Sequence, residues 1–451
     1  MNPGNLSAAP SGDRRSYTSD IAALLLLSTS LWLALQSNRN IYTGLVLFMI
    51  GLMCLSLSRR THSSQFIARA ARGIYTLTPT AVILTFVAVT LSDFGRYLTQ
   101  ADFGMFYSTA LQLRTDPAHL YDIEAQNRML AVVTGGLENH YLSFPYPPFV
   151  AALFVPLSYL SFRNAYLTML GCNLVLLVFI VYILCMSVCT TRDQRLTLIL
   201  AASVSLPLYI NLALGQMAFV GLLLFSLFIC DVLGQKTTRA GLWVGLLAYK
   251  ITLVPLAFLV LLTQRAWKGM GVAIAAMFFL FVVSLALVGI PGLLGNLNVM
   301  TMMMSASQIP RMQSLRALTY YVGMPGWTFW PLAATVVAAW IVVNQRARHP
   351  KWVLAAAILA NLLVAPYVQS YDLCLGLLAI ALAISSYSRM PDWRRSVFLL
   401  LAFLPPFVSV TGQVTGRNWP AAPITILALF VYCLYRAGGG AVSDGSGELS
   451  N

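Results

Sequence analysis

The chain has 451 residues, of which 59% are hydrophobic and only 9% are charged. A soluble domain carries about 25% charged residues, so a soluble fold of this length is excluded. The formal net charge is +14, but the basic residues lie in short joints between apolar runs and form no basic stripe with aromatic residues. This distribution argues against a nucleic-acid partner and predicts a polytopic protein surrounded by membrane lipids.

Long apolar runs separated by short polar joints predict the membrane helices. The runs lie near 21–36, 41–58, 74–92, 146–161, 165–190, 196–214, 216–233, 240–263, 269–289, 317–343, 352–367, 371–387, 396–411 and 420–436. Most Lys and Arg residues gather in alternate joints, which the positive-inside rule places in the cytoplasm. We therefore predict an all-α polytopic fold of about twelve transmembrane helices, with both termini cytoplasmic.

The two ends of the chain are polar. Residues 1–20 form a cytoplasmic tail without the residue order of a cleavable signal, so the first apolar run is expected to stay as a membrane helix. Residues 21–73 predict two N-terminal spans followed by a basic cytoplasmic loop. Residues 437–451 are rich in Gly and Ser and predict a disordered cytoplasmic tail.

Two apolar runs conflict with simple alternation across the membrane. If 146–161 crossed it, Arg192 and Arg195 would lie outside, so the charge rule favours an interfacial or re-entrant helix. The run 240–263 has basic residues at both ends and carries Lys250 and a proline in its middle. A re-entrant hairpin of two half-helices, with Lys250 near its tip, satisfies both facts.

Residues 93–145 form a long external loop that is acidic, in a chain where 28 basic residues outnumber 14 acidic ones. Asp102 opens a helix-like pattern that continues through Leu113, and a carboxylate at such a position often caps a helix. Asp102 is thus either a cap or a functional acid. Tyr146 precedes two prolines, which are typical of a first helical turn. We expect interfacial helices in this loop.

Short motifs follow one another from about residue 100 to 375. They are Asp102-Phe-x-x-Phe-Tyr107, Leu120-Tyr121-Asp122, Tyr146-Pro-Pro-Phe149, Pro156-Leu157, Gly215-Gln216, the glycine-rich run from Gly241 to Tyr249-Lys250, and Ala365-Pro-Tyr-Val-Gln-Ser-Tyr-Asp372. In order and spacing they resemble glycosyltransferase family 87, membrane enzymes of the GT-C fold that use polyprenyl-phosphate sugars. The resemblance implies a GT-C-like catalytic domain over 74–436.

The resemblance also implies roles for individual residues. Asp102 is the expected catalytic base, because an acceptor hydroxyl must lose its proton as it attacks the anomeric carbon. The leaving group is a lipid phosphate, whose developing charge calls for a cation. Lys250 is the first candidate, since a lysine inside an apolar run is costly. Arg311 and Arg316, in the external segment 291–316, are further candidates for binding the donor phosphate.

Acceptor or sugar binding is expected of Asp93, Tyr107, Tyr146, Gln216, Tyr371 and Asp372. Helix capping or anchoring at the membrane interface is the structural alternative for such residues, and a snorkelling or structurally paired lysine is the alternative for Lys250. His119 and His140 have no partner at a metal-ligand spacing, so neither a metal nor another cofactor is expected.

The function implied by the resemblance is transfer of a hexosyl group from a polyprenyl-phosphate sugar donor to a lipid or glycan acceptor. The resemblance favours mannose as the hexose. The reaction would take place at the non-cytoplasmic face of the cell membrane, with inversion of the anomeric carbon. A transporter or lipid flippase is the alternative, because many spans, an intramembrane lysine and a broken helix fit one. Against that alternative, the halves of the chain show no repeat.

Overall fold

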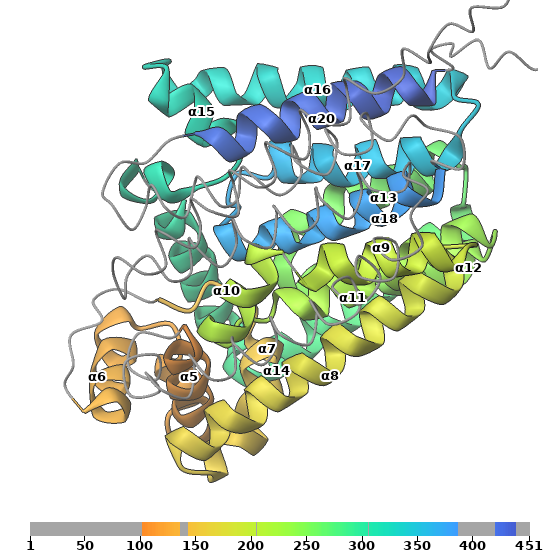
Figure 1. Ribbon diagram of the computed structural model, residues 1–451. Helices are drawn as coiled ribbons and strands as arrows, with labels where there is room; N and C mark the ends of the chain where they lie inside the picture. The colour runs from red at the N-terminus through yellow and green to blue at the C-terminus, as the bar shows by residue number, and fades with distance from the viewer. Residues whose placement is uncertain (1–101, 136–142, 204, 305, 387–419, 439–451) are drawn as a thin grey trace, which may run out of the picture. The chain divides into compact units, whose positions relative to one another are not determined.

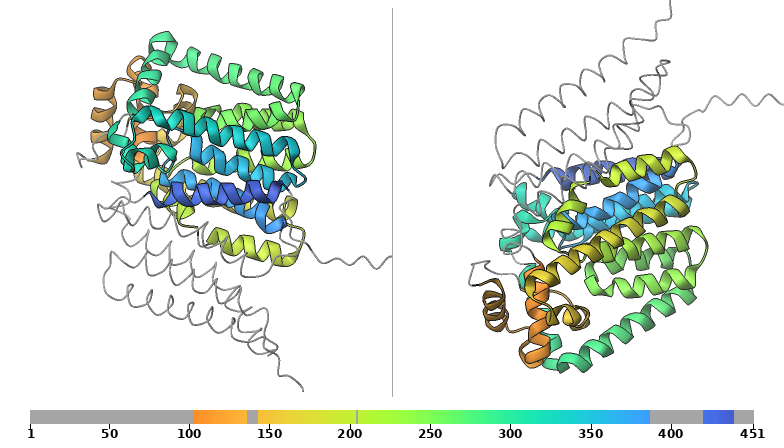
Figure 2. Two further views of the ribbon diagram at one scale, coloured as in Figure 1. Left: turned by 90° about the horizontal axis from the view of Figure 1, so that it is seen from above. Right: turned by 60° about the horizontal axis from the view of Figure 1, so that its bottom comes forward.

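A computed structural model describes residues 102–135, 143–203, 205–304, 306–386 and 420–438. Within these ranges every regular element is a helix, which confirms the all-α prediction (Figure 1). The longer helices lie side by side in all three views (Figures 1 and 2). Outside the described residues lie the predicted tail 1–20, Asp93, nearly all of the tail 437–451, and the predicted runs 21–36, 41–58, 74–92 and 396–411.

Four helical segments of the described part are long and apolar enough to cross a membrane. The helices α9 and α10 pass the same test together, bent by 50°, which brings the number to five. These segments support a membrane protein, while the count of about twelve spans stays a prediction. The segments are α8 (Phe162–Ser187), Thr237–Thr263, α14 (Trp267–Met303), Gly326–Arg346, and the pair α9 (Arg192–Ser203) with α10 (Leu206–Leu214).

Short helices form in the described part of the acidic loop and in the run 146–161 that follows it, and they gather near one end of the long helices (Figure 1). Asp122 caps one of them by accepting a hydrogen bond from the Ala125 amide, and Gly135 ends it at a φ of 71°. Prolines begin another, as predicted, and the run 146–161 forms helices shorter than a span. The elements are α5 (Phe103–Thr115), η2 (Pro117–His119), α6 (Ile123–Thr134), α7 (Pro148–Phe154) and η3 (Val155–Tyr159).

The segment Thr237–Thr263 is broken at Lys250, whose φ of −136° and ψ of 91° are not helical. A straight helix of 27 residues would separate its two ends by about 40 Å. Instead Gly269, six residues after Thr263, lies against the Thr237 backbone. The chain therefore turns back near Lys250, while re-entry into a membrane stays a prediction. The parts are α12 (Thr237–Leu246), η4 (Leu247–Leu253) and α13 (Val254–Thr263).

One predicted run ends at a break in the structure, and another is wrong. The helix of the run 269–289 breaks at Gly289, whose φ of 66° other residues rarely adopt, and a second helical stretch follows it as the rest of α14 up to Met303. The run 317–343 is not one helix, since a turn with Gly323 at a φ of 73° divides it. The elements after α14 are η5 (Ala306–Arg311), α15 (Leu315–Tyr321), η6 (Gly326–Thr328) and α16 (Phe329–Arg346).

The last described helices form the most buried part of the fold. Almost every side chain of α17 and α18 is buried, and α20 packs on α17. A long apolar surface on all sides of a helix is typical of a central position in a bundle. The elements are α17 (Pro350–Val364), η7 (Ser370–Leu375), α18 (Gly376–Ser386) and α20 (Ala421–Ala437).

Basic joints meet at one end of the helices. Where α11 (Ala218–Leu233) ends, the buried Asp231 carboxylate accepts from Arg239 Nη2 at 3.0 Å and from Trp243 Nε1 at 2.7 Å. Arg436 lies over the Trp352 ring, 5.7 Å from its centroid. Because α11 and α12 run between this end and the end that carries Gln216 and Lys250, the basic joints and those two residues lie at opposite ends of both helices.

Candidate functional site

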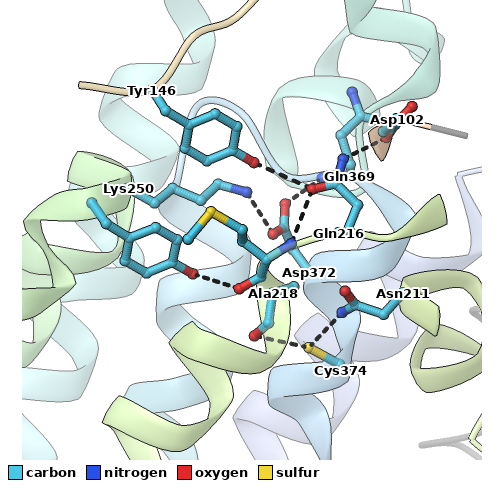
Figure 3. A network of polar contacts seen from close by, with 11 residues as sticks. Asp102, Tyr146, Asn211, Gln216, Ala218, Lys250, Gln369, Asp372 and Cys374 are labelled. Atoms are coloured by element: carbon cyan, nitrogen blue, oxygen red, sulfur yellow. Dashed lines mark hydrogen bonds and ion pairs between the residues drawn. The ribbon is translucent and has the colours of Figure 1, made fainter. Parts of the chain in front are cut away.

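Asp102 precedes the first turn of α5, and its side chain bonds to a distant part of the chain. The carboxylate makes no capping hydrogen bond with α5. Instead Oδ2 accepts from Gln216 Nε2 at 2.5 Å (Figure 3). Burial raises the pKa of Asp102 to about 6, against the opposing effect of the Gln216 hydrogen bond. The alternative that Asp102 serves as a helix cap is therefore wrong.

Gln216 reaches Asp102 because the chain before it is held tightly. Gly215 ends α10 with a φ of 62°, and a Cβ on it would lie 2.8 Å from the Phe103 Cβ. Only glycine permits both this conformation and this approach to α5. The Gln216 amide N–H donates to the Asn211 carbonyl at 3.0 Å, and its carbonyl accepts from Asn173 Nδ2 at 3.1 Å. The backbone of Gln216 is thus fixed from two helices.

Tyr146 joins the acidic loop to the same group. Its hydroxyl donates to Gln216 Oε1 at 3.4 Å, and its ring stacks on that of Tyr249 with centroids 6.4 Å apart. The Tyr146 carbonyl accepts from the Tyr121 hydroxyl at 2.6 Å and from Asn296 Nδ2 at 2.9 Å. Burial holds the pKa of the Tyr146 hydroxyl well above its usual value, so the hydroxyl stays a donor at neutral pH.

Lys250 and Asp372 form an ion pair, with Nζ 2.5 Å from Oδ1 and side chains that are 10% and 5% exposed. The second Asp372 oxygen accepts from the Gln369 amide at 2.8 Å and so caps η7. The ammonium also faces the rings of Tyr371 and Tyr367, 5.3 and 6.0 Å from their centroids. The alternatives of a paired lysine and a capping aspartate are both observed, and the pairing fixes the ammonium (Figure 3).

A pocket lies beside this ion pair. Apart from the Lys250 ammonium, its walls are aromatic, proline and aliphatic side chains with one threonine, and methionines of α14 supply one side. One fixed charge among apolar walls is typical of a site for a ligand with a charged head and an apolar body. The lining residues are Pro145, Tyr146, Pro147, Tyr249, Lys250, Ile251, Thr252, Met300, Met303, Met304 and Tyr367.

The remaining predicted residues take different positions. Arg316 is partly buried, and its Nη2 donates at 2.8 Å to the carbonyl of Met304, which is one of the residues that line the pocket. Arg311 is exposed at the end of η5. The Tyr107 hydroxyl donates to the Leu160 carbonyl at 2.7 Å, so it ties α5 to the chain after η3. The structure thus brings together Asp102, Tyr146, Gln216, Lys250, Tyr371 and Asp372, while the Tyr107 hydroxyl bonds outside this group.

Several residues of the cluster were not predicted as site residues. Asn173, Asn211 and Asn296 are buried and bond to its backbone, and Asn211 Nδ2 also lies 3.7 Å from Cys374 Sγ. Asn173 and Asn211 stand inside apolar runs, where an amide side chain is costly, and that cost was the available signal; Asn296 lies in the predicted external segment and carried no such signal. Tyr249 lies in the glycine-rich motif that ends at Lys250, and nothing in that motif indicates the stacking of its ring on Tyr146.

Metal ligands do not gather in the described ranges, where no three His, Cys, Asp or Glu side chains come together. The titratable groups of the cluster are instead one carboxyl held by an amide, one ion pair and several tyrosines. Such a set suits proton transfer and the binding of an anion.

Fold and site together define an all-helical membrane protein with a buried polar site at one end of its helices. The sequence model of glycosyltransferase family 87 matches residues 144–366, and this match places the chain in that family. The chain is accordingly a membrane glycosyltransferase, which requires a sugar donor and an acceptor. The matched range includes Tyr146, Gln216 and Lys250 but neither Asp102 nor Asp372. Searches of curated proteins and of solved structures gave no match.

Proposed function

We propose that the protein transfers a hexose, mannose by preference, from a polyprenyl-phosphate donor to a lipid or glycan acceptor at the non-cytoplasmic face of the cell membrane. The proposal includes a GT-C-like domain over 74–436. The observation that carries it is the cluster in which a carboxyl, Asp102, and an ammonium, Lys250, lie with the same group of buried tyrosines.

Asp102 is the proposed general base. With a pKa of about 6, its carboxyl is about nine-tenths ionised at pH 7 and still basic enough to accept a proton. Among the described residues, none donates a hydrogen bond to Oδ1, which leaves this oxygen for the acceptor hydroxyl. The hydroxyl oxygen attacks the anomeric carbon, the bond from that carbon to the phosphate oxygen breaks, and Asp102 takes the proton. One such displacement inverts the anomeric configuration.

Lys250 is the proposed partner of the leaving phosphate. An ammonium has three N–H donors, and Asp372 occupies one of them, so two remain for phosphate oxygens. Asp372 also fixes the direction of the side chain, which spares the cost of ordering it when the donor binds. Arg316, which bonds to the carbonyl of the pocket residue Met304, and Arg311 are proposed as further contacts to the phosphate.

The apolar wall beside Lys250 suits the lipid part of the donor. Met300, Met303 and Met304 line the pocket that holds the ammonium, and unbranched thioether side chains adapt to an irregular isoprenyl chain. Tyr371, Tyr146 and Asp372 stay proposed contacts of sugar or acceptor hydroxyls, as do Tyr107 and Asp93, whereas the Gln216 amide, predicted as such a contact, is already engaged with Asp102.

The two ends of the helices support the proposed orientation. Basic joints lie at the end opposite to Gln216 and Lys250, and such joints are expected in the cytoplasm. The site then faces the periplasm or the cell exterior, and both termini are cytoplasmic. In this orientation Thr237–Thr263 enters and leaves from the cytoplasmic face, as a re-entrant hairpin with Lys250 at its tip.

The test is transfer of radiolabelled mannose from polyprenyl-phosphate mannose to membrane lipids by the purified protein. We expect Asp102→Asn to lower transfer by about 10²–10⁴-fold, because an amide keeps the shape of the side chain but accepts no proton. The matched control is Asp122→Asn, an exposed capping carboxylate of the same loop, which should keep its activity.

Each outcome of this test is informative. Transfer by the parent and by both variants would retain the enzyme and assign the base elsewhere, with Asp93 next. If a panel of polyprenyl-phosphate sugars gave no transfer, while the protein moved such a lipid between the leaflets of a vesicle, the transporter alternative would replace the proposal.

A further inference from the structure

The side chain of Gln216 lies between Asp102, the candidate base, and two other groups, the Tyr146 hydroxyl and the Met217 amide. It is 2% exposed, and its two ends face different groups. Oε1 lies 3.4 Å from the Tyr146 hydroxyl and 3.4 Å from the Met217 amide nitrogen. Nε2 lies 2.5 Å from Asp102 Oδ2. A buried amide with both ends engaged has one favourable orientation.

The orientation follows from the chemistry of the partners. The Met217 N–H is only a donor, so it requires the amide oxygen on its side. An ionised carboxylate is only an acceptor, so it requires the amide nitrogen on its own side. With the amide reversed, its oxygen would face the carboxylate and its nitrogen the Met217 N–H, and both contacts would be repulsive. Gln216 therefore favours the charged form of Asp102.

The backbone of Gln216 is held as firmly as its side chain. Asn173 and Asn211 bond to its carbonyl and its amide, and Gly215 brings the turn against Phe103. A side chain that turned to bind a sugar hydroxyl would leave both Asp102 and the Met217 N–H without a partner. Such a loss inside a buried site opposes that role.

From these contacts we infer that Gln216 is a positioning residue for the base. Its amide, oriented by Tyr146 and the Met217 N–H, keeps Asp102 ionised and directs Oδ1 toward the acceptor. This role replaces the sugar-binding role expected of Gln216, and it gives Tyr146 the function of orienting the amide. The inference rests on the proposed function only where it calls Asp102 the base.

The other titratable groups near Asp102 do not supply this effect. Tyr146, from the segment before α7, and Tyr367 and Tyr371, from the segment around η7, feel the Asp102 charge, but a tyrosine hydroxyl is neutral near pH 7. The Lys250–Asp372 pair carries no net charge. Among the described residues, burial and the Gln216 hydrogen bond account for the shift of the Asp102 pKa. No side chain of α6 or α8 contributes to that shift.

The first test reads the protonation of Asp102 without any substrate. A hydrophobic carbodiimide reacts with a protonated carboxyl in an apolar site, so peptide mass spectrometry of labelled Asp102 against pH gives a midpoint. We expect a midpoint near pH 6 in the parent protein and a rise of about one pH unit in Gln216→Ala. Gln216→Glu, which has the same shape but a second carboxyl in place of the amide donor, should raise it further.

The matched control is Gln112→Ala. Gln112 is also 2% exposed and donates from Nε2, but to the His119 carbonyl at 2.6 Å rather than to a carboxylate. Its loss removes a comparable buried hydrogen bond from α5, so a general loosening of this helix would shift both midpoints alike. We expect Gln112→Ala to leave the Asp102 midpoint in place. Equal midpoints in the parent and in both Gln216 variants would overturn the inference.

The second test uses the pH dependence of kcat/KM for transfer. The acidic limb should move upward by about one unit in Gln216→Ala and by less in Tyr146→Phe. If Gln216 bound a sugar hydroxyl instead, the limb would stay in place and KM would rise at every pH, which would also overturn the inference. Because labelling needs no turnover, a shifted midpoint in a chain without transferase activity would reject the proposed function and keep the role of Gln216.

Discussion

The Lys250–Asp372 pair shows how strongly one buried charge depends on another. Each side chain is at most 10% exposed, and the two residues are 122 positions apart in the chain. Removing one partner leaves the other charge buried and uncompensated, which is strongly destabilising, whereas removing both is often nearly neutral. Single and double variants of this pair can therefore distinguish a stabilising role of Lys250 from a catalytic one.

We expect Lys250→Met to lower the free energy of unfolding by about 3–5 kcal/mol and to abolish transfer. The double variant Lys250→Met, Asp372→Asn should regain most of the stability, since no buried charge remains, but not the activity. Thermal unfolding in detergent and the mannose-transfer assay measure the two effects. A double variant that regains transfer would show that Lys250 is only a structural partner.

Because the pKa of Asp102 is raised in the fold, its ionised carboxylate lowers the stability of the protein at neutral pH. Its pKa is 3.8 in the unfolded chain and about 6 in the fold, so the fold prefers the protonated group and loses stability as pH rises through 6. We expect Asp102→Asn to stabilise the protein at pH 7.5 by about 1–3 kcal/mol, and to have little effect near pH 4. Unfolding midpoints at the two pH values test this, and equal midpoints for parent and variant at pH 7.5 would contradict it.

At the scale of elements, the sequence predicted helices better than it predicted their ends. The helices α8, α11, α17 and α20 lie within a few residues of their predicted runs, because long apolar stretches leave few alternatives. The run 269–289 ends at the break at Gly289 inside α14, but the second helical stretch up to Met303 was not predicted, because residues such as Gly289 and Pro291 usually mark the end of a helix.

Close packing of α12 on α14 depends on small residues. A Cβ on Gly241 would lie 1.9 Å from the Gly269 carbonyl oxygen, so the helices touch through their backbones. We expect Gly241→Ala to force them apart and to lower stability by about 1–3 kcal/mol. Gly271→Ala, on α14 with nothing within 4 Å, is the control and should be neutral or slightly stabilising. Similar unfolding temperatures for both variants would show that this contact is not tight.

For the whole molecule, the separation of charge between helix ends was predictable and the assembly of the site was not. The positive-inside rule sorts the joints without knowing which helices are neighbours. Asp102, Gln216, Lys250 and Asp372 were each predicted as candidates from motifs. Their pairing as Asp102 with Gln216 and Lys250 with Asp372 depends on tertiary contacts across 114 and 122 residues.

The proposed orientation predicts opposite accessibility for two exposed positions, Ala118 in η2 and His349 before α17. In a chain whose seven native cysteines are replaced by alanine, we expect Ala118→Cys to react with a membrane-impermeant maleimide in intact cells. His349→Cys should react only after the cells are permeabilised. The reverse pattern would place the site in the cytoplasm and contradict the proposed face of the reaction.

The distance along the chain between Lys250 and Asp372 also sets a delay during synthesis, between the addition of the lysine and the addition of its aspartate partner. At about 5–20 residues per second, a ribosome needs roughly 6–24 s to add the 122 residues that separate them. Throughout that interval the nascent chain holds a lysine in an apolar segment before its carboxylate exists. Until the aspartate is made, either another anion must pair with this ammonium or the amine must lose its proton.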